Sequence, residues 1–449
     1  SKEHPHRDVL RVLEREKHRV QWMRTDRNGL CTVTFGNGRP IALARGEISD
    51  PRPNTLDAPP PPEVVEQRVT VDHQPVEVVT RVPAGVRRVV VTIDVEPGEP
   101  ARPPPELVLA GGRPLPDLVF VTDAERLTDN VGRAEARQAL DAIRSAGQTV
   151  VSPRELPDAL EPHIRGVVIV GGYDVVPAQR RDCLPPPVRE SLGVTDDPDD
   201  FIVFSDDDYG DDGDRETPPV PVSRIPDAHS FTLLRAALSA ARRGHGRRGV
   251  RNSERPFAED IFSTLPGEDE LLVSAPTTFD GIAALDADLV YLMLHGDYAD
   301  GSRFWGEGPT GNVEAVNVRN IPDVGPRVVF TGCCWGALTV DQPAHKALLP
   351  APKAVNASIA LRFLEAGATA FVGCTGAHYS PREPPYRYFG GPMHEGFWHG
   401  INDGLAPAEA LLAAKAQYVR DFPHGLRSEA QHAIEYKTLH QYTCLGLGW

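Results

Sequence analysis

The residues with the clearest potential for chemistry are one histidine and two cysteines, each at the end of an apolar run. LVYLMLHG ends in His295 and Gly296, and RVVFTGCC ends in Cys333 and Cys334. A thiolate can attack a carbonyl carbon while an imidazole protonates the leaving amine. A glycine beside the histidine leaves its backbone N–H open to the oxyanion of acyl transfer. The pattern predicts a cysteine hydrolase; the alternative is that His295 caps a strand and the cysteines are small core residues.

The elements that must position these residues alternate along the chain. Continuous apolar runs predict buried strands at 117–122, 166–172, 287–296 and 326–334. Helices are expected over 131–146, 231–243, 357–366 and 405–420. This alternation predicts an α/β fold with a parallel sheet and helices on both faces. Functional side chains of such sheets gather beyond the carboxyl ends of the strands, where His295 and Cys334 stand.

The first part of the chain has a different composition. Residues 1–112 begin with a helical pattern and continue with strand-like alternating runs and two proline clusters, PRPNTLDAPPPP and PGEPARPPP. We expect a mostly-β accessory domain there. A first α/β subdomain over 113–226 and a catalytic α/β subdomain over 227–449 should follow.

The ordered motifs resemble those of the gingipain-type peptidases of the caspase-like clan. That family follows its His-Gly with a Trp-Gly, matched here by Trp305 and Gly306, and its Ala-Cys-x-x-Gly segment resembles FTGCCWG. VIVGGYDVVP, SDDDYG and PVSRIPD stand in the order of three further family segments. The resemblance covers about 116–449. It implies a caspase- and gingipain-like parallel-sheet sandwich and the activity of a bacterial cysteine endopeptidase.

The same resemblance implies roles for individual residues. Cys334 would be the nucleophile, His295 the general acid and base, and the backbone N–H groups of Gly296 and Cys334 the oxyanion hole. The family's early Gly-Asp is Gly171–Gly172 here, and the carboxylate that assists the family's histidine has no counterpart in the sequence.

Specificity for Arg, or for Lys, before the cleaved bond is a further implication. SERPFAEDIFSTL resembles the family segment that supplies an acidic pocket residue, which would be Glu254. A carboxylate forms a bidentate, charge-assisted pair with a guanidinium. Asp297 is a second candidate for this pocket, and Trp305 is expected to contact substrate. The alternative is that Glu254 is an exposed acid at the start of a helix.

An arginine-rich segment, ARRGHGRRGVR at 241–251, predicts an exposed and mobile loop. Its arginines are Arg242, Arg243, Arg247, Arg248 and Arg251. Because caspase-like enzymes are often switched on by processing between their halves, we expect cleavage here, by the protein itself or by an activating protease of a bacterial cascade. The alternative is a surface loop without a regulatory role.

Composition excludes several classes of protein. The formal net charge of −16 disfavours binding to nucleic acid or to an anionic membrane surface. No run approaches the roughly 18 apolar residues of a membrane span. The chain opens without a secretory signal, and its six cysteines lack a CxxC motif, so a cytoplasmic location is expected. Protein or peptide substrates are the expected partners.

Cofactors are not expected, with one exception. The acidic stretches at 195–200 and 205–214 could bind calcium, although neither fits an EF-hand loop. MHEGFWHG offers His394 and His399, but these are not spaced as in the H-E-x-x-H motif of zinc proteases, so no metal site is expected there.

Two other functions stay open at the level of sequence. The chain could be a catalytically silent caspase-like fold that acts as a binding or regulatory module. It could also be an α/β small-molecule hydrolase or transferase, although GxSxG and phosphate-binding loops are absent from the sequence.

Overall fold

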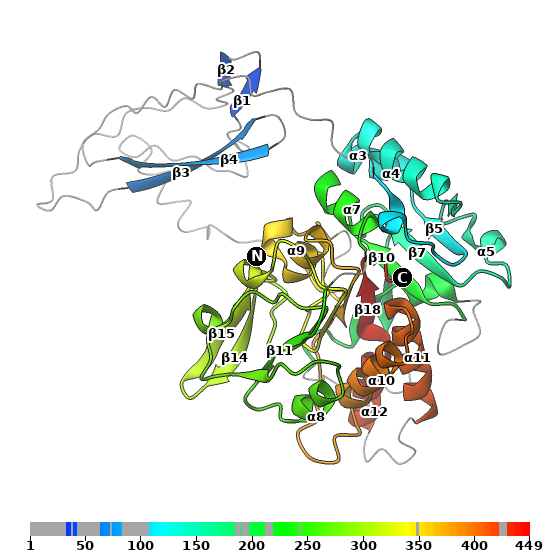
Figure 1. Ribbon diagram of the computed structural model, residues 1–449, viewed down its shortest axis with the longest axis vertical. Helices are drawn as coiled ribbons and strands as arrows, with labels where there is room; N and C mark the ends of the chain where they lie inside the picture. Colours follow the sequence, from blue (N-terminus) through cyan, green and yellow to red (C-terminus); the bar gives the residue numbers. More distant parts are fainter. Residues whose placement is uncertain are drawn as a thin grey trace, which may run out of the picture. The chain divides into compact units, whose positions relative to one another are not determined.

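Two units, Ser1–Pro104 and Pro105–Trp449, divide the chain in the computed structural model. Side chains are described for residues 107–184, 189, 197–211, 219–241, 244–346, 350–421 and 431–449, and the backbone also for 429–430 and four earlier strands. Those strands form two antiparallel hairpins (Figure 1). They are β1 (Val33–Gly36) with β2 (Arg39–Ala42), and β3 (Glu63–Val71) with β4 (Gln74–Val82). The helical pattern expected at the start of the chain lies outside the described residues.

A ten-stranded sheet forms the centre of the second unit, in the order β12-β11-β13-β16-β17-β18-β10-β7-β5-β6. In chain order, its strands are β5 (Leu118–Val121), β6 (Thr149–Val151), β7 (Gly166–Val170), β10 (Val222–Ile225), β11 (Arg247–Asn252), β12 (Leu271–Ser274), β13 (Leu289–Met293), β16 (Val328–Thr331), β17 (Ala370–Cys374) and β18 (Tyr442–Leu445). The predicted subdomains 113–226 and 227–449 therefore share one sheet.

Neighbouring strands of this sheet are parallel except for β17 and β18, which are antiparallel. The sheet thus consists of two parallel sets that run in opposite directions, with their carboxyl ends at opposite edges. We call these the β13–β16 edge and the β7–β10 edge. Strands β5, β7, β13 and β16 are buried along their whole length, as a parallel sheet covered on both faces requires.

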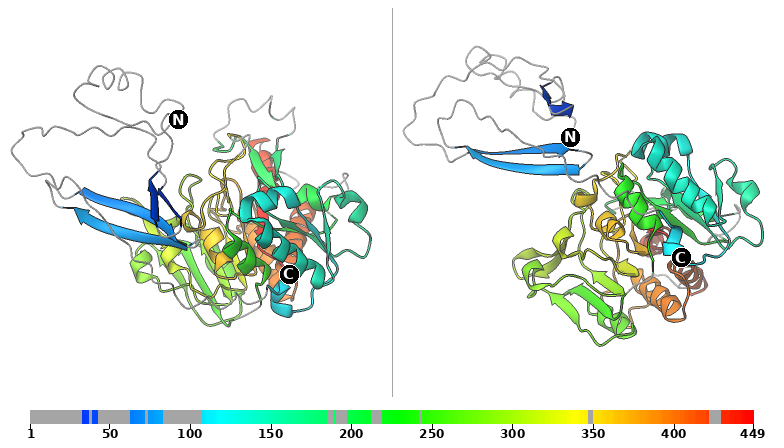
Figure 2. Two further views of the ribbon diagram at one scale, coloured as in Figure 1. Left: turned by 90° about the horizontal axis from the view of Figure 1, so that it is seen from above. Right: turned by 45° about the horizontal axis from the view of Figure 1, so that its top comes forward.

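Helices cover both faces of the sheet, as predicted (Figures 1 and 2). The described helices of the second unit are α3 (Ala124–Val131), α4 (Arg133–Ser145), α5 (Leu156–Ala159), α7 (Phe231–Leu238), α8 (Phe257–Ser263), α9 (Ile359–Glu365), α10 (Gly390–Asn402), α11 (Pro407–Arg420) and α12 (Glu429–Gln441). Helix α7 packs against α4 and α9, whereas α10 packs against α8 and α11. Within the described part of the chain, no helix is long and apolar enough to cross a membrane.

Two small antiparallel strand pairs lie outside the central sheet in the described part of the second unit. Strands β8 (Gln179–Asp182) and β9 (Ile202–Ser205) form one antiparallel pair, and β14 (Arg303–Gly308) and β15 (Gly311–Asn317) form the other. The second hairpin follows β13 directly, so it lies next to the β13–β16 edge.

The predicted loop over 241–251 is wrong for its second half. Arg247, Arg248 and Arg251 belong to β11, inside the central sheet. Each guanidinium has partners that offset the repulsion between like charges. Arg247 donates to the carbonyls of Phe262 and Leu265, at 2.6 and 2.5 Å. Arg248 lies 3.6 Å from Asp269, and Arg251 donates to Glu259 at 3.1 Å. The other two arginines, Arg242 and Arg243, lie outside the described residues.

Candidate active site

The sheet brings the predicted histidine and cysteine to one place. Strands β13 and β16 are parallel neighbours, with Leu292 opposite Thr331, and His295 and Cys334 follow just beyond their carboxyl ends. The two segments touch, because a Cβ atom at Gly296 would lie 2.1 Å from the carbonyl oxygen of Cys334. Only glycine fits at this position, so its presence beside the histidine has a steric reason as well as the expected chemical one.

The two adjacent cysteines have different environments. Cys333 is fully buried, and burial raises the pKa of its thiol to about 12. Cys334 is partly exposed, and its Sγ accepts a hydrogen bond from the backbone N–H of His378 at 3.2 Å. Burial also raises the pKa of Cys334, while the His378 N–H acts in the opposite direction. Cys334 is therefore the accessible thiol of the pair, and Cys333 is part of the core.

A carboxylate that sequence reasoning missed lies beside His295. The backbone of His295 pairs with Trp305 through two hydrogen bonds of 2.7 and 3.0 Å. Farther along β14, the Glu307 carboxylate places Oε1 3.4 Å from His295 Nε2. The contact is longer than a good hydrogen bond, and both His295 Nε2 and Glu307 Oε2 lack hydrogen-bond partners among the described residues. The sequence did contain a signal, because residues 305 and 307 point to the same face of a strand.

The surroundings of His295 lower its pKa and so favour its neutral form. Burial lowers its pKa, the Glu307 charge raises it, and the Arg255 charge lowers it again. A half-buried imidazole that is neutral at physiological pH can accept a proton from a thiol. The nearby negative charge of Glu307 favours the imidazolium that forms when it does so.

The backbone at this edge offers donors to a negative charge. Among the described residues, neither the Gly296 nor the Cys334 amide N–H has a hydrogen-bond acceptor. The turn continues through Trp335, whose φ of 51° lies in the left-handed region that non-glycine residues rarely adopt. Free N–H groups beside a partly exposed thiol are the arrangement that an oxyanion hole requires.

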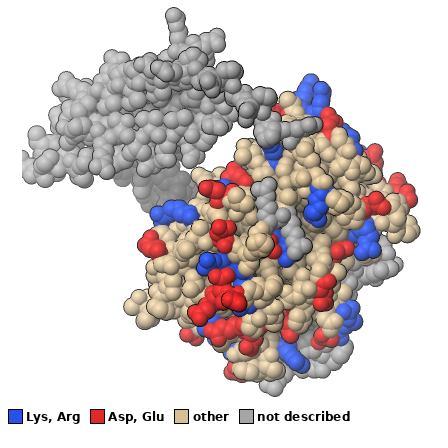
Figure 3. All heavy atoms as spheres, in the orientation of Figure 1, with Lys and Arg blue, Asp and Glu red and all other residues tan. Residues whose placement is uncertain are grey.

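Two hollows lie along β11 and β12, one of about 410 Å³ and one of about 600 Å³, and the larger one lies beyond the carboxyl ends of these strands. The larger is lined by Glu254 and Glu307, with Ser253, Ala275, Pro276 and the turn between β14 and β15. Asp and Glu side chains gather on the face shown in Figure 3, in the part of the molecule where β11 and β14 lie in Figure 1. This hollow joins the predicted pocket residue to the carboxylate beside His295.

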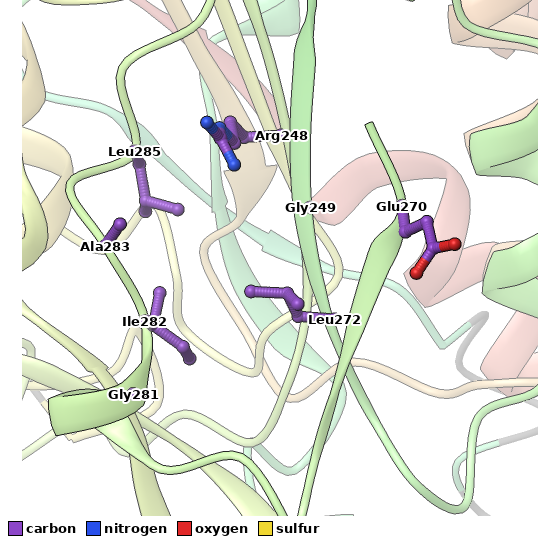
Figure 4. A pocket seen from close by; sticks show the side chains of 8 residues that line it. All are labelled: Arg248, Gly249, Glu270, Leu272, Gly281, Ile282, Ala283 and Leu285. Carbon is purple, nitrogen blue, oxygen red and sulfur yellow. The ribbon is translucent and has the colours of Figure 1, made fainter. Parts of the chain in front are cut away.

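The smaller hollow lies along β11 and β12 (Figure 4). Leu272 and Ile282 contribute apolar side chains to it, and Arg248 and Glu270 contribute charged ones. It contains neither the histidine nor the cysteine of the site described above.

The other predicted substrate-binding residues are not part of the larger hollow's lining. Asp297 is exposed, and its carboxylate accepts a hydrogen bond from the Ala299 N–H at 2.7 Å. Trp305 is partly buried, and its backbone joins β14 to His295. Their roles in substrate binding stay predictions.

Several acids of the two stretches considered for calcium have basic partners. Asp197 and Asp199 share Lys437, Asp206 pairs with the buried Arg224, and Asp207 pairs with Lys415. Within the described ranges, no cluster of His, Cys, Asp and Glu is arranged to hold a metal ion. Calcium binding stays untested.

The chain is similar in structure to several proteins. No protein-family model matches it, and no curated protein matches it in sequence. Similarity to a structure of the Arg-specific cysteine proteinase gingipain R (RgpB) has a TM-score of 0.48 at 13% identity, over 76% of this chain and 78% of that one. Similarity to the complex of Porphyromonas gingivalis RgpB pro- and mature domains has a TM-score of 0.47 at 12% sequence identity, over 74% of this chain and 78% of that one. Similarity to the Saccharomyces cerevisiae separase–securin complex has a TM-score of 0.30 at 11% sequence identity, over 51% of this chain and 14% of that one.

Proposed function

We propose that the protein is a cysteine endopeptidase, with Cys334 as nucleophile and His295 as general acid and base. The observation that carries this proposal is the position of a partly exposed thiol and a half-buried imidazole, each just beyond the carboxyl end of one of two adjacent parallel strands, β13 and β16. The N–H groups of Gly296 and Cys334, which have no acceptor among the described residues, support it, because acyl transfer needs donors for the developing oxyanion.

The reaction would proceed in two halves. Cys334 Sγ loses its proton to His295 as it bonds to the substrate carbonyl carbon, and the carbonyl oxygen becomes an oxyanion that accepts hydrogen bonds from Gly296 and Cys334. His295 then gives its proton to the leaving amine as the C–N bond breaks. Next, His295 takes a proton from water as the water oxygen attacks the thioester carbon. His295 then returns that proton to Cys334 Sγ as the C–S bond breaks, which releases the acid and the free thiol. Glu307 stabilises the imidazolium in both halves.

Separate alanine variants of the two cysteines test this proposal. Cys334→Ala should abolish cleavage in a peptide library, whereas Cys333→Ala should retain most of it, because Cys333 is buried. A chloromethyl ketone peptide should label the wild type at Cys334. Equal loss in both variants, or labelling at Cys333, contradicts the assignment. No label and no cleavage in the folded wild type would favour a silent fold that acts as a binding module.

We further propose that cleavage follows Arg in preference to Lys. The support is Glu254 in the lining of the larger hollow, which extends to Glu307 beside His295, since a carboxylate forms a bidentate, charge-assisted pair with a guanidinium. Glu254→Gln should lower kcat/KM for arginyl substrates by roughly 10- to 100-fold, the effect of losing a charge-assisted pair. An unchanged ratio between arginyl and neutral substrates removes Glu254 from the pocket, and cleavage after Asp overturns the proposed specificity.

A further inference from the structure

A buried ion pair lies behind the turn that carries Cys334. Asp199 and Lys437 are both fully buried, and Lys437 Nζ lies 2.6 Å from Asp199 Oδ2 and 2.5 Å from Asp197 Oδ1. Lys437 comes from α12, 238 residues beyond Asp199. Burying charges is costly even when they are paired, so such a pair is weak evidence for a role in stability alone.

The Asp199 carboxylate accepts hydrogen bonds from two chain segments, the turn that carries Cys334 and the segment that donates to its thiol. Its Oδ1 accepts the indole N–H of Trp335 at 2.8 Å, and its Oδ2 accepts the backbone N–H of Ala377 at 2.6 Å. Trp335 directly follows Cys334. Ala377 directly precedes His378, whose N–H donates to Cys334 Sγ. One side chain therefore holds the turn that presents the thiol and the segment that supplies the thiol's hydrogen bond.

We propose that Asp199, with Lys437 as its counter-ion, is a positioning residue for Cys334. This inference rests on the proposed function, in which Cys334 is the nucleophile. The φ of 51° at Trp335 persists only if its surroundings enforce it, and the Asp199–indole hydrogen bond is a contact that does so. A displacement of about 1 Å at a reacting atom can cost about 100-fold in rate, so loss of this contact should slow the chemical step.

Asp199 could act on Cys334 through its charge or by holding the thiol in place, and these two roles predict different results for variants. Among the charged groups near the thiol, Lys437 and Arg255 lower the pKa of Cys334, and Asp199 raises it. Asp199→Asn should therefore lower this pKa, and Lys437→Met should raise it. If charge alone mattered, the two variants would change reactivity in opposite directions. If position matters, both lose kcat.

The experiment measures alkylation of Cys334 by iodoacetamide across a range of pH, without substrate, and then kcat and KM. Asp199→Asn should move the alkylation midpoint to lower pH and yet lower kcat by about tenfold or more, with little change in KM. Trp335→Phe keeps the ring but removes the N–H, so it should lower kcat less. The double variant should lose less kcat than the sum of the two single losses, because the indole hydrogen bond that Trp335→Phe removes is one of the contacts that Asp199→Asn disturbs. Asp207→Asn is the matched control, since it breaks the pair with Lys415 at 2.6 Å.

Two results would overturn the inference. The first is a loss of kcat in Asp199→Asn no larger than in Asp207→Asn. The second is full additivity of the Asp199 and Trp335 variants. If Asp199→Asn does not fold, Trp335→Phe decides, and unchanged alkylation and kcat in that variant contradict the inference. If the wild type is alkylated at Cys334 but cleaves no peptide, the proposed function fails while the alkylation profiles still test the positioning.

Discussion

Each of the two carboxyl edges of the sheet carries a histidine beside a carboxylate, and the two pairs differ in how fully they are hydrogen-bonded. At the β7–β10 edge, Asp227 is fully buried, and its carboxylate accepts hydrogen bonds from the Gly172 and His229 amides and from the Asn130 side chain. His229 Nε2 also lies 2.7 Å from Asp174 Oδ2. Of these carboxylate oxygens, Asp174 Oδ1 alone lacks a partner among the described residues.

At the β13–β16 edge, polar side-chain atoms lack hydrogen-bond partners among the described residues. His295 and Glu307 are 3.4 Å apart, and neither His295 Nε2 nor Glu307 Oε2 has a hydrogen-bond partner in the described part of the chain. Buried polar groups normally find partners, so a cluster that does not find them points to a ligand or a reaction. A histidine close to a carboxylate occurs at both edges. The hydrogen bonding around each pair distinguishes the structural pair from the candidate catalytic one.

The largest test of this comparison replaces the histidine at each edge. His295→Ala should lower kcat/KM for peptide cleavage by about 10²- to 10⁴-fold, the usual contribution of a general acid and base. His229→Ala should change kcat/KM by about twofold at most, because its side chain is half-exposed and its partners are structural. Steady-state kinetics with both variants at matched folded fractions gives the result. Similar losses in the two variants would mean that the comparison of edges does not identify the active one.

The carboxylates provide the next test. Glu307→Gln should lower kcat by about tenfold for arginyl and neutral substrates alike, because the imidazolium loses its stabilising charge. Its stability should change little, since the side chain is partly exposed. Asp227→Asn should do the reverse, with a loss of about 1–3 kcal/mol in unfolding free energy and nearly unchanged kcat. Denaturant unfolding and kinetics of both variants separate the effects. A loss confined to arginyl substrates would assign Glu307 to the specificity pocket instead.

The sequence predicted the parts of this site that depend on local pattern. Apolar runs identified the strands, and the carboxyl-edge rule then brought His295 and Cys334 together. Glu307 was missed because the strand face that it shares with Trp305 does not by itself place β14 beside His295. Asp199 and Lys437 were missed for a stronger form of the same reason, since their contact spans most of the second unit. Composition also misled: arginines that suggested a loop pair with α8 and with residues beyond it.

The smallest expected effect concerns the pH dependence at the β13–β16 edge. One proton shared by Cys334 and His295 is needed for attack, so kcat/KM should fall below the pKa of His295 and above that of Cys334. Burial lowers the first pKa and raises the second, which predicts a broad plateau between them.

The positive charge of Arg255 lowers the pKa of both His295 and Cys334. Arg255→Gln should therefore move both limbs of the profile to higher pH, and only slightly, because solvent and salt screen part of this charge. Arg126→Gln, at the β7–β10 edge where Arg126 donates to the Asp174 carbonyl, should leave both limbs in place. High salt should bring the wild-type profile closer to that of Arg255→Gln, because it screens the same charge. Limbs that move to lower pH in Arg255→Gln, or that move equally in Arg126→Gln, would show that the reacting pair is not in the field of Arg255.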